Sequence, residues 1–292
     1  MFELININKV YGDSKNSVKA LKDISIKFPN KGLVAIIGTS GCGKSTLLNV
    51  MTTIDKPTSG KIYFCGKDVS KFNKKKLANY RGNEIGIVFQ NFNLFEDETV
   101  YRNIIKPYLI NINKIPQIKN EIEKYCLYFG LNKEILNKNI YDLSGGEKQR
   151  VAIIRSLINN PKVIFADEPT GQLDESNSLN VLSIFKRISK DRLVIIVSHD
   201  LENVKKFTDK IIKMEDGKII NYPSFDISNG IKANAKYKRK SIFTWPLREG
   251  FSNLKRRKGK NVISSISIGI GLISTLLIQS FASNYLKPSL YY

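Results

Sequence analysis

A glycine-rich segment near the N-terminus has the composition and spacing of a phosphate-binding loop. Residues 38–46 read Gly-Thr-Ser-Gly-Cys-Gly-Lys-Ser-Thr and match the pattern GxxxxGK[ST]. The segment follows an apolar run at 33–37 and precedes a helical run at 46–51, which is the strand–loop–helix context that such a loop requires. A chance match in a chain of this length has a probability on the order of one per cent. The segment therefore predicts a site for nucleotide phosphates.

The residue types of this loop assign a contact to each part of a nucleotide. Backbone N–H groups between the glycines converge on phosphate oxygens at a helix N-terminus. Lys44 brings a positive charge to the β- and γ-phosphates, the Ser45 hydroxyl can bind Mg²⁺, and the Thr46 hydroxyl can support the α-phosphate. The predicted binding residues are Gly38, Thr39, Ser40, Gly41, Cys42, Gly43, Lys44, Ser45 and Thr46. We expect a nucleoside triphosphate, such as ATP, and Mg²⁺ as the ligands.

Two carboxylates end an apolar run further along the chain. Residues 163–168 read Val-Ile-Phe-Ala-Asp-Glu. Asp167 can hold the coordination shell of a magnesium ion, and Glu168 can polarise a water molecule that attacks phosphorus. Acidic residues often end strands, so this pair is a weak signal when taken without the loop.

A second glycine-rich motif opens a predicted helix. Residues 143–150 read Leu-Ser-Gly-Gly-Glu-Lys-Gln-Arg. The Ser144 hydroxyl, the N–H groups around Gly145 and Gly146 and the helix dipole could all interact with a phosphate. A helix that Ser144 merely caps is the alternative explanation.

The combination of these three motifs resembles the nucleotide-binding domain of ABC transporters, and the resemblance covers roughly residues 2–222. It implies a RecA-like P-loop NTPase fold with an antiparallel β subdomain and a helical subdomain at about 91–143. It also implies that Glu168, His199, Gln90 and Lys44 serve catalysis.

The same resemblance assigns roles to single residues outside the loops. Tyr11 resembles the aromatic residue that stacks on adenine, with simple packing as the alternative, and Gln90 resembles the Q-loop glutamine, a further Mg²⁺ ligand beside Ser45 and Asp167. Asp174 resembles the D-loop aspartate. His199 is the chain's one histidine and resembles the switch histidine, whose ring can hydrogen-bond a transferring phosphoryl group.

In this family the second glycine-rich motif of one chain completes the ATP site of another chain. The resemblance therefore implies a head-to-tail homodimer that encloses two ATP molecules. Ser144, Gly145 and Gly146 would then contact the nucleotide held by the partner.

The stretches ADEPTGQLD and NFNLFEDETVYRNI are similar to the MacB, LolD, FtsE and bacitracin-exporter subgroup, which drives permeases related to FtsX. Gln172 stands where this subgroup usually has Asn, and Lys148 stands where Gln is common. Neither departure removes a catalytic side chain.

The elements that must position these motifs can be read from hydrophobic patterns. Residues 2–9 and 24–28 alternate as half-buried strands do, and 33–37, 85–89, 163–166 and 193–197 are short apolar runs typical of fully buried strands. Helical patterns follow Lys44 and Gly145 and run from 177 to 190. Between 91 and 141 the apolar residues recur at helical spacing. This alternation predicts an α/β fold with a mainly parallel sheet, within an ATPase domain at 1–222.

The composition changes after residue 222. We predict a basic linker at 223–240, an amphipathic helix and basic cluster at 241–261, a transmembrane helix at 262–281 and an extracytoplasmic tail at 282–292. Residues 262–281 carry no charge and match the roughly 20 residues that cross a bilayer. The basic cluster just before them keeps the ATPase domain on the cytoplasmic side of the cell membrane. This order resembles the fused MacB layout, so we expect the front part of a longer protein or a split subunit.

The strongly basic composition does not by itself identify a partner. The formal net charge is +21 over 292 residues, which fits an anionic membrane surface, nucleic acid, or simply solvated lysine-rich faces. The three cysteines lack metal-ligand spacing and indicate a reducing cytosol. No secretory signal pattern opens the sequence.

We expect an ATPase that couples dimer closure to an FtsX- or MacB-like permease and exports a peptide, antibiotic or lipoprotein-type substrate, without a nucleic-acid partner. A regulatory cassette similar to FtsE that controls a cell-wall enzyme is one alternative. A soluble ABC ATPase acting on nucleic acid or ribosomes is another.

Overall fold

The computed structural model describes residues 2–13, 16–107 and 115–221. The predicted linker, amphipathic helix, transmembrane helix and tail at 223–292 lie outside the described residues. Within the described part, no helix combines the length and the apolar character needed to cross a membrane.

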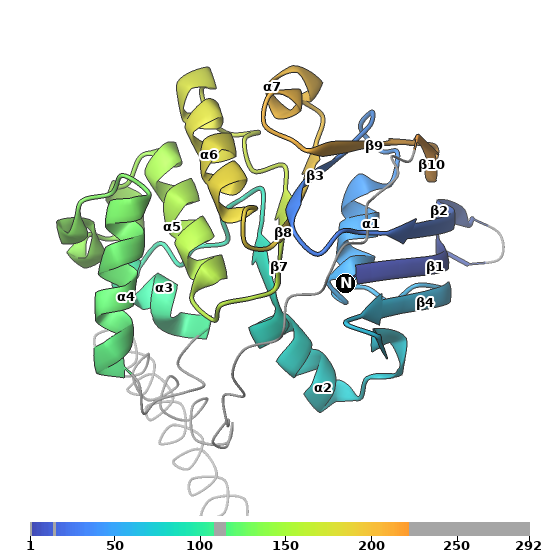
Figure 1. Cartoon of the computed structure of the whole chain (residues 1–292), viewed down its shortest axis with the longest axis horizontal. Helices are drawn as coiled ribbons and strands as arrows, with labels where there is room; N and C mark the ends of the chain where they lie inside the picture. Colours follow the sequence, from blue (N-terminus) through green and yellow to red (C-terminus); the bar gives the residue numbers. More distant parts are fainter. Residues whose placement is uncertain (1, 14–15, 108–114, 222–292) are drawn as a thin grey trace, which may run out of the picture. The chain divides into compact units, whose positions relative to one another are not determined.

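A six-stranded sheet forms the centre of the ATPase domain, in the order β10-β9-β3-β8-β7-β6 (Figure 1). Its strands are β3 (Gly32–Ile37), β6 (Ile85–Val88), β7 (Val163–Asp167), β8 (Leu193–Ser198), β9 (Lys210–Glu215) and β10 (Lys218–Asn221). All neighbours pair in parallel except β10, which pairs antiparallel with β9. The prediction of a mainly parallel sheet is confirmed, whereas β9 and β10 were not predicted.

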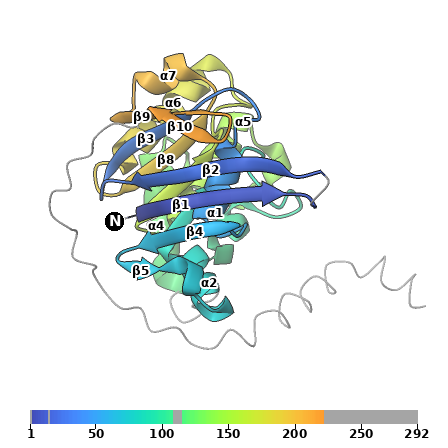
Figure 2. The same cartoon turned by 90° about the vertical axis from the view of Figure 1, so that its right-hand side faces the viewer.

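A second sheet is antiparallel, with the order β2-β1-β4-β5 (Figure 2). It contains β1 (Phe2–Tyr11), β2 (Val18–Lys27), β4 (Ser59–Phe64) and β5 (Lys67–Asp68). The register of β1 against β2 shifts between Leu4 and Ile7. Asn6 has a φ of 48° at this irregularity, and the shift keeps both Leu4 and Ile7 buried although they are three residues apart.

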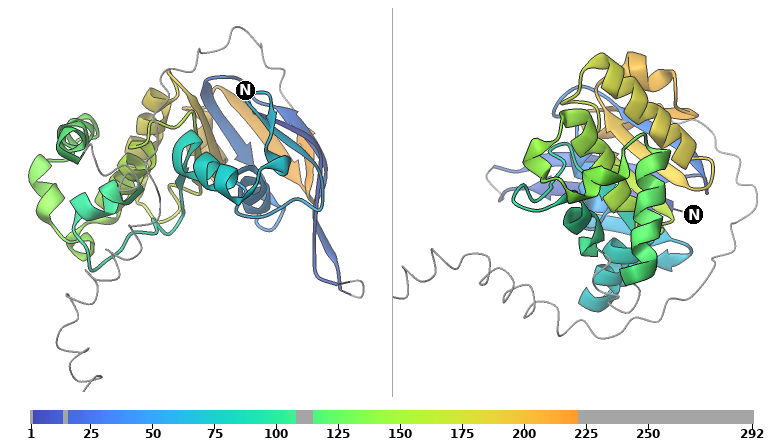
Figure 3. Two further views of the ribbon diagram at one scale, coloured as in Figure 1. Left: turned by 90° about the horizontal axis from the view of Figure 1, so that it is seen from below. Right: turned by 90° about the vertical axis from the view of Figure 1, so that its left-hand side faces the viewer.

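The helices are α1 (Lys44–Met51), α2 (Lys74–Asn79), α3 (Val100–Ile105), α4 (Ile115–Tyr128), α5 (Gly145–Leu157), α6 (Glu175–Ile188) and α7 (Leu201–Lys205). In Figure 3, left, α3, α4 and α5 lie on the opposite side of the central sheet from the antiparallel strands. Helices α3 and α4 occupy the segment predicted to be helical, although the exact boundary of a helical subdomain remains a prediction.

Alternation along the central strands divides the interior into two cores. On β3, Leu33, Ala35 and Ile37 pack with residues of α3, α4, α5 and α6. Val34 and Ile36 of the same strand face the other way and pack with α1 and the antiparallel sheet. The central sheet is therefore buried on both faces, which explains why its strands are continuous apolar runs in the sequence.

An aromatic cluster joins the two sheets. Phe2 on β1 makes edge-to-face contacts with Phe28, Phe64 on β4 and Phe165 on β7, with ring centroids 6.0, 6.1 and 5.7 Å away. Phe2 is fully buried. Edge-to-face pairs stabilise a fold beyond the area they bury, so Phe2 ties the antiparallel sheet to the central one.

We expect Phe2→Ala to lower the free energy of unfolding by about 3–5 kcal/mol, because it removes a buried ring and leaves a cavity between the sheets. Urea denaturation followed by circular dichroism would measure the loss. Ile5→Ala on the same strand is the control, since Ile5 is 39% exposed. A similar loss for both variants would contradict the role given to the cluster.

Candidate nucleotide site

The carboxyl ends of four neighbouring strands meet at one edge of the central sheet. In the order β3-β8-β7-β6, Ile37 pairs with Ser198, Val197 with Asp167, and Ala166 with Val88. The phosphate loop follows β3, His199 follows β8, Glu168 follows β7 and Gln90 lies two residues beyond β6. Parallel pairing thus gathers motifs that are far apart in the sequence.

The phosphate loop has a backbone that requires glycine at two positions. Gly41 and Gly43 have φ values of 79° and 100°, in the left-handed region that glycine adopts at no steric cost. A Cβ on Gly43 would also lie 2.4 Å from the Ala20 carbonyl oxygen. Gly43 is the N-cap of α1 and makes no side-chain cap, so the first N–H groups of this helix remain available to an anion.

Lys44 is held inside the loop by neutral groups. Its ammonium donates to the carbonyl oxygens of Gly38 at 2.9 Å and Thr39 at 2.8 Å, and its residue is 5% exposed. Among the described residues no carboxylate forms an ion pair with it. The positive charge is therefore retained at the loop, where it can act on a phosphate.

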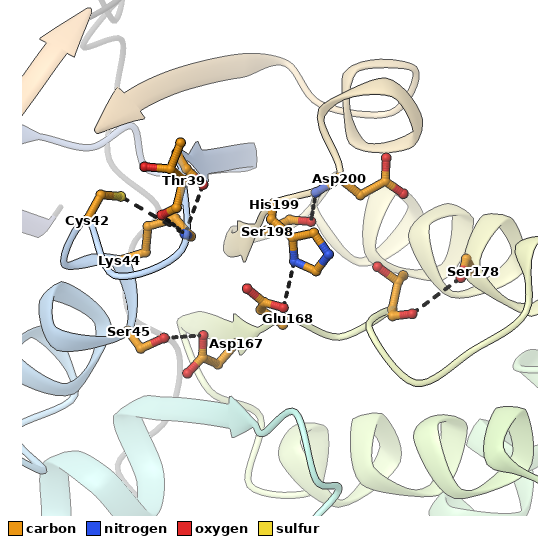
Figure 4. A network of polar contacts seen from close by, with 12 residues as sticks. Thr39, Cys42, Lys44, Ser45, Asp167, Glu168, Ser178, Ser198, His199 and Asp200 are labelled. Atoms are coloured by element: carbon orange, nitrogen blue, oxygen red, sulfur yellow. Dashed lines mark hydrogen bonds and ion pairs between the residues drawn. The ribbon is translucent and has the colours of Figure 1, made fainter. Parts of the chain in front are cut away.

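Ser45 and Asp167 approach each other from α1 and β7. The Ser45 hydroxyl donates to Asp167 Oδ1 at 3.1 Å (Figure 4). Burial raises the pKa of Asp167, and the nearby charge of Glu168 raises it further. The hydrogen bond from Ser45 and the charge of Lys44 lower this pKa, but the net shift is upward. A hydroxyl and a carboxylate are hard oxygen donors of the kind that Mg²⁺ binds together with substrate phosphates, so this pair fits the predicted metal.

Glu168 and His199 form the second polar pair of the site. His199 Nδ1 lies 2.8 Å from Glu168 Oε2 (Figure 4), and the imidazole is 61% exposed. Glu168 has a φ of 43°, and its N–H donates to the Val197 carbonyl of β8. This left-handed conformation costs about 1–2 kcal/mol. It turns the chain so that consecutive carboxylates point to different partners, Asp167 to Ser45 and Glu168 to His199.

Gln90 and Glu168 both approach Gly171. A Cβ added to Gly171 would lie 3.5 Å from Glu168 Oε2 and 3.7 Å from Gln90 Nε2. The side chains of Gln90 and Glu168 therefore approach Gly171 together. The structure brings Lys44, Ser45, Asp167, Glu168, His199 and Gln90 to one sheet edge.

Two residues outside the predicted set fix the segment that follows Gln90. The Arg155 guanidinium of α5 donates to the carbonyl oxygens of Phe92, at 2.7 Å, and Asn93. Phe92 and Asn93 have φ values of 57° and 49°, and burial lowers the pKa of Arg155 to about 10. The side-chain amide of Gln172 also donates to Asn91 Oδ1 at 2.9 Å. Arg155 carried no sequence signal, because its partners are backbone carbonyls.

The second glycine-rich motif is a capped helix start in the structure. Ser144 is the N-cap of α5 in a capping box with Glu147, whose carboxylate accepts from the Ser144 N–H and hydroxyl. A Cβ on Gly146 would lie 2.4 Å from Asn177 Oδ1 on α6. Among the described residues, no hydrogen bond or ion pair joins Ser144, Gly145 or Gly146 to the phosphate loop of the same chain.

Asp174 caps α6. Its carboxylate accepts from the Asn177 backbone N–H at 2.8 Å and from the Asn177 side chain at 2.7 Å, and these bonds lower the pKa of Asp174. Since Asn177 also touches Gly146, Asp174 is connected to the second glycine-rich motif through one residue.

Tyr11 lies at the end of β1, and 40% of its surface is exposed. Its hydroxyl donates to Asp55 Oδ2 at 2.7 Å, and the Lys9 ammonium is 4.6 Å from its ring centroid. Burial and the bond to Asp55 raise the pKa of Tyr11, which a hydrogen bond with Thr46 opposes. Tyr11 therefore lies next to the last residue of the phosphate loop. Lys9 and Asp55 were not predicted.

Comparison with known proteins identifies a family match. The profile described as ABC transporter matches residues 21–171. The lipoprotein-releasing system ATP-binding protein LolD of Wigglesworthia glossinidia brevipalpis is 38% identical over 73% of this chain and 93% of its own length. The macrolide export ATP-binding/permease protein MacB of Bdellovibrio bacteriovorus is 32% identical over 94% of this chain but 43% of its own length. The chain thus spans less than half the length of this MacB protein.

A solved structure gives a further match. The dimeric post-hydrolysis state of the ATP-binding cassette MJ0796, bound to ADP and Pi, has a TM-score of 0.68 and 33% identity. The match covers 76% of this chain and 97% of that one.

We expect Asp167→Asn to raise the melting temperature in the absence of nucleotide and magnesium. The folded pKa of Asp167 lies above its ordinary value of 3.8, so the folded protein binds this proton more readily than the unfolded chain does. Ionisation therefore destabilises the fold as the pH rises through this range. The gain should be larger at about pH 7 than at about pH 4.5.

Thermal unfolding at both pH values would measure this gain. Asp191→Asn is the matched control, because Asp191 is exposed on the turn before β8 and its substitution should have little effect. A lower melting temperature for Asp167→Asn at neutral pH would show that the carboxylate stabilises the fold.

Proposed function

This chain belongs to the ABC transporter family, and from that membership we propose that it is the ATP-hydrolysing part of an exporter in the MacB and LolD subgroup. The chain is an ATPase, as its motifs predicted. The observation that carries the proposal is the meeting of Lys44, the Ser45–Asp167 pair and the Glu168–His199 pair at one sheet edge.

The arrangement suits attack of water on the γ-phosphorus of ATP. Loop N–H groups and Lys44 hold the phosphates, and Ser45 with Asp167 would hold Mg²⁺, which supplies charge neutralisation at the β- and γ-phosphates when bound. Glu168 accepts a proton from the attacking water. The new O–P bond forms as the bond to the β–γ bridging oxygen breaks, which yields ADP and phosphate.

His199 and Gln90 complete the site around the attacked phosphorus. The contact of His199 Nδ1 with Glu168 leaves Nε2 as the ring nitrogen for the γ-phosphate, where a hydrogen bond stabilises the developing charge. Gln90 adjoins Glu168 across Gly171 and begins the segment that Arg155 clamps. We assign Gln90 a role in communication. When the nucleotide and its metal bind at the site, Gln90 would transmit the change to α5.

We further propose a head-to-tail homodimer in which Ser144, Gly145 and Gly146 contact the ATP of the partner chain. Two findings support this. Among the described residues, no hydrogen bond or ion pair joins the motif to its own phosphate loop, and the similar cassette MJ0796 is a dimer bound to ADP and Pi. ATP would close the two chains, and hydrolysis would reopen them.

The proposed partner of this motion is an FtsX- or MacB-like permease in the cell membrane, with the ATPase domain on the cytoplasmic side. The similarity to MacB extends over 286 residues, well beyond the ATPase domain, and thus supports the fused order of linker, amphipathic helix and transmembrane helix. LolD is named for lipoprotein release and MacB for macrolide export, which supports export as the direction.

We expect Glu168→Gln to lower ATP turnover by about two to four orders of magnitude, because the amide cannot accept the proton of the attacking water. ATP binding should persist, so the variant should elute as a dimer with ATP in size-exclusion chromatography. Lys44→Ala should instead weaken ATP binding and stay monomeric. Exposed Glu202→Gln is the control; wild-type turnover in Glu168→Gln would remove Glu168 from this role.

Deletion of residues 262–281 should release the protein from the membrane fraction. The full chain should resist both high-salt and alkaline washes, because an inserted apolar helix is not held by charge. Release of the full chain by salt would contradict membrane insertion and favour an electrostatic contact. Immunoblotting of pellet and supernatant measures the distribution.

A further inference from the structure

Lys9, Tyr11 and Asp55 form a closed cluster of side chains beside the phosphate loop. Asp55 lies just beyond α1 and is 44 residues from Tyr11 in the sequence. The Asp55 carboxylate accepts from Lys9 Nζ at 2.7 Å through Oδ1 and from the Tyr11 hydroxyl at 2.7 Å through Oδ2. One carboxylate therefore fixes both the cation and the aromatic residue.

The remaining polar atoms of the cluster are also engaged. Asp55 Oδ1 accepts the Lys56 N–H at 2.7 Å, and Lys9 Nζ donates to the Lys56 carbonyl oxygen at 2.9 Å. Burial raises the pKa of Asp55, but the bonds from Lys9, Tyr11 and Lys56 outweigh it and lower that pKa. The carboxylate is thus held in its charged form by its partners.

The cation occupies one face of the Tyr11 ring. The ammonium lies 4.6 Å from the ring centroid, and the Lys9 side chain is 12% exposed, so a largely covered cation supports the ring. Tyr11 itself remains 40% exposed. The ring therefore offers a face to solvent while its hydroxyl donates to Asp55.

We propose that Lys9 and Asp55 are positioning residues that hold Tyr11 as a one-sided stacking platform for the base of the bound nucleotide. The proposal rests on the ATP site described above and extends it to residues outside every motif. A ring fixed before binding loses less conformational entropy when the base stacks on it. An ammonium on its far face adds a favourable electrostatic contact with the π-system.

The polar groups of the cluster are already engaged, which affects how the cluster would recognise a base. The hydroxyl of Tyr11, both oxygens of Asp55 and the ammonium of Lys9 all bond within the cluster or to the chain beside it. Stacking is then the contact that the cluster offers, and every purine has a face that can stack. ATP and GTP should depend on Lys9 and Asp55 to the same degree.

The test measures steady-state hydrolysis by the full chain. Asp55→Asn removes the charge that pairs with Lys9, and Lys9→Met keeps the length of the side chain without its ammonium. Each should raise KM for ATP and for GTP by about three- to tenfold and leave kcat within about twofold. Inhibition by tripolyphosphate, which has no base, should be unchanged.

Lys162→Met is the matched control. Lys162 makes the same two kinds of contact as Lys9, an ion pair with Glu84 at 2.8 Å and a ring contact with Phe64 at 5.6 Å. It should leave KM unchanged. In a Tyr11→Ala background, Asp55→Asn should have no further effect on KM, because the ring that Asp55 positions is gone.

Three other results would each contradict a different part of the proposal. Weaker inhibition by tripolyphosphate in Asp55→Asn would mean that the cluster supports the phosphate loop through Thr46. A higher KM in Tyr11→Ala with normal values in Asp55→Asn and Lys9→Met would mean that Tyr11 stacks unaided, and the ATPase site would stand. An unchanged KM in Tyr11→Ala would remove Tyr11 from ATP binding.

Discussion

The hydrogen-bonded register between β3, β8, β7 and β6 holds the ATPase site together. Each of these strands ends at the same edge of the sheet, and the residues proposed for the reaction lie in the segments that follow the strands. A slip of two residues in one strand would move its carboxylate or imidazole by about 7 Å. Such a slip is prevented because both faces of the sheet are buried in well-packed cores.

This rigid edge allows the site to keep groups that do not favour folding. Asp167 is a half-buried carboxylate with a raised pKa, and Glu168 has a left-handed backbone. Both costs are tolerated because the strands on either side are fixed by long ladders of hydrogen bonds and by rings such as Phe165. Strain and burial at functional positions are then offset by packing elsewhere in the domain.

The loops around this edge are connected to one another as well as to the sheet. Arg155 joins α5 to the segment after Gln90, Gln172 joins that segment to the loop before α6, and Asn177 joins α6 to Gly146. A change beside the γ-phosphate can therefore reach the start of α5 through direct contacts. In the proposed dimer, the residues at the start of α5 face the nucleotide of the partner chain. A dimer with shared ATP sites needs such a connection, because each site must then respond to the other.

Short-range patterns in the sequence were sufficient for the phosphate loop, the Asp167–Glu168 pair and the four central strands, because glycine spacing and apolar runs are local properties. The strands β4, β9 and β10 were missed because their short or mixed sequences acquire strand structure from their pairing partners. Tertiary structure decided which carboxylate faces Ser45 and which faces His199, and it placed Arg155 on two backbone carbonyls that no side-chain pattern records. It also decided that Lys9, Tyr11 and Asp55 form one cluster, because a contact across 44 residues depends on how β1 and α1 pack.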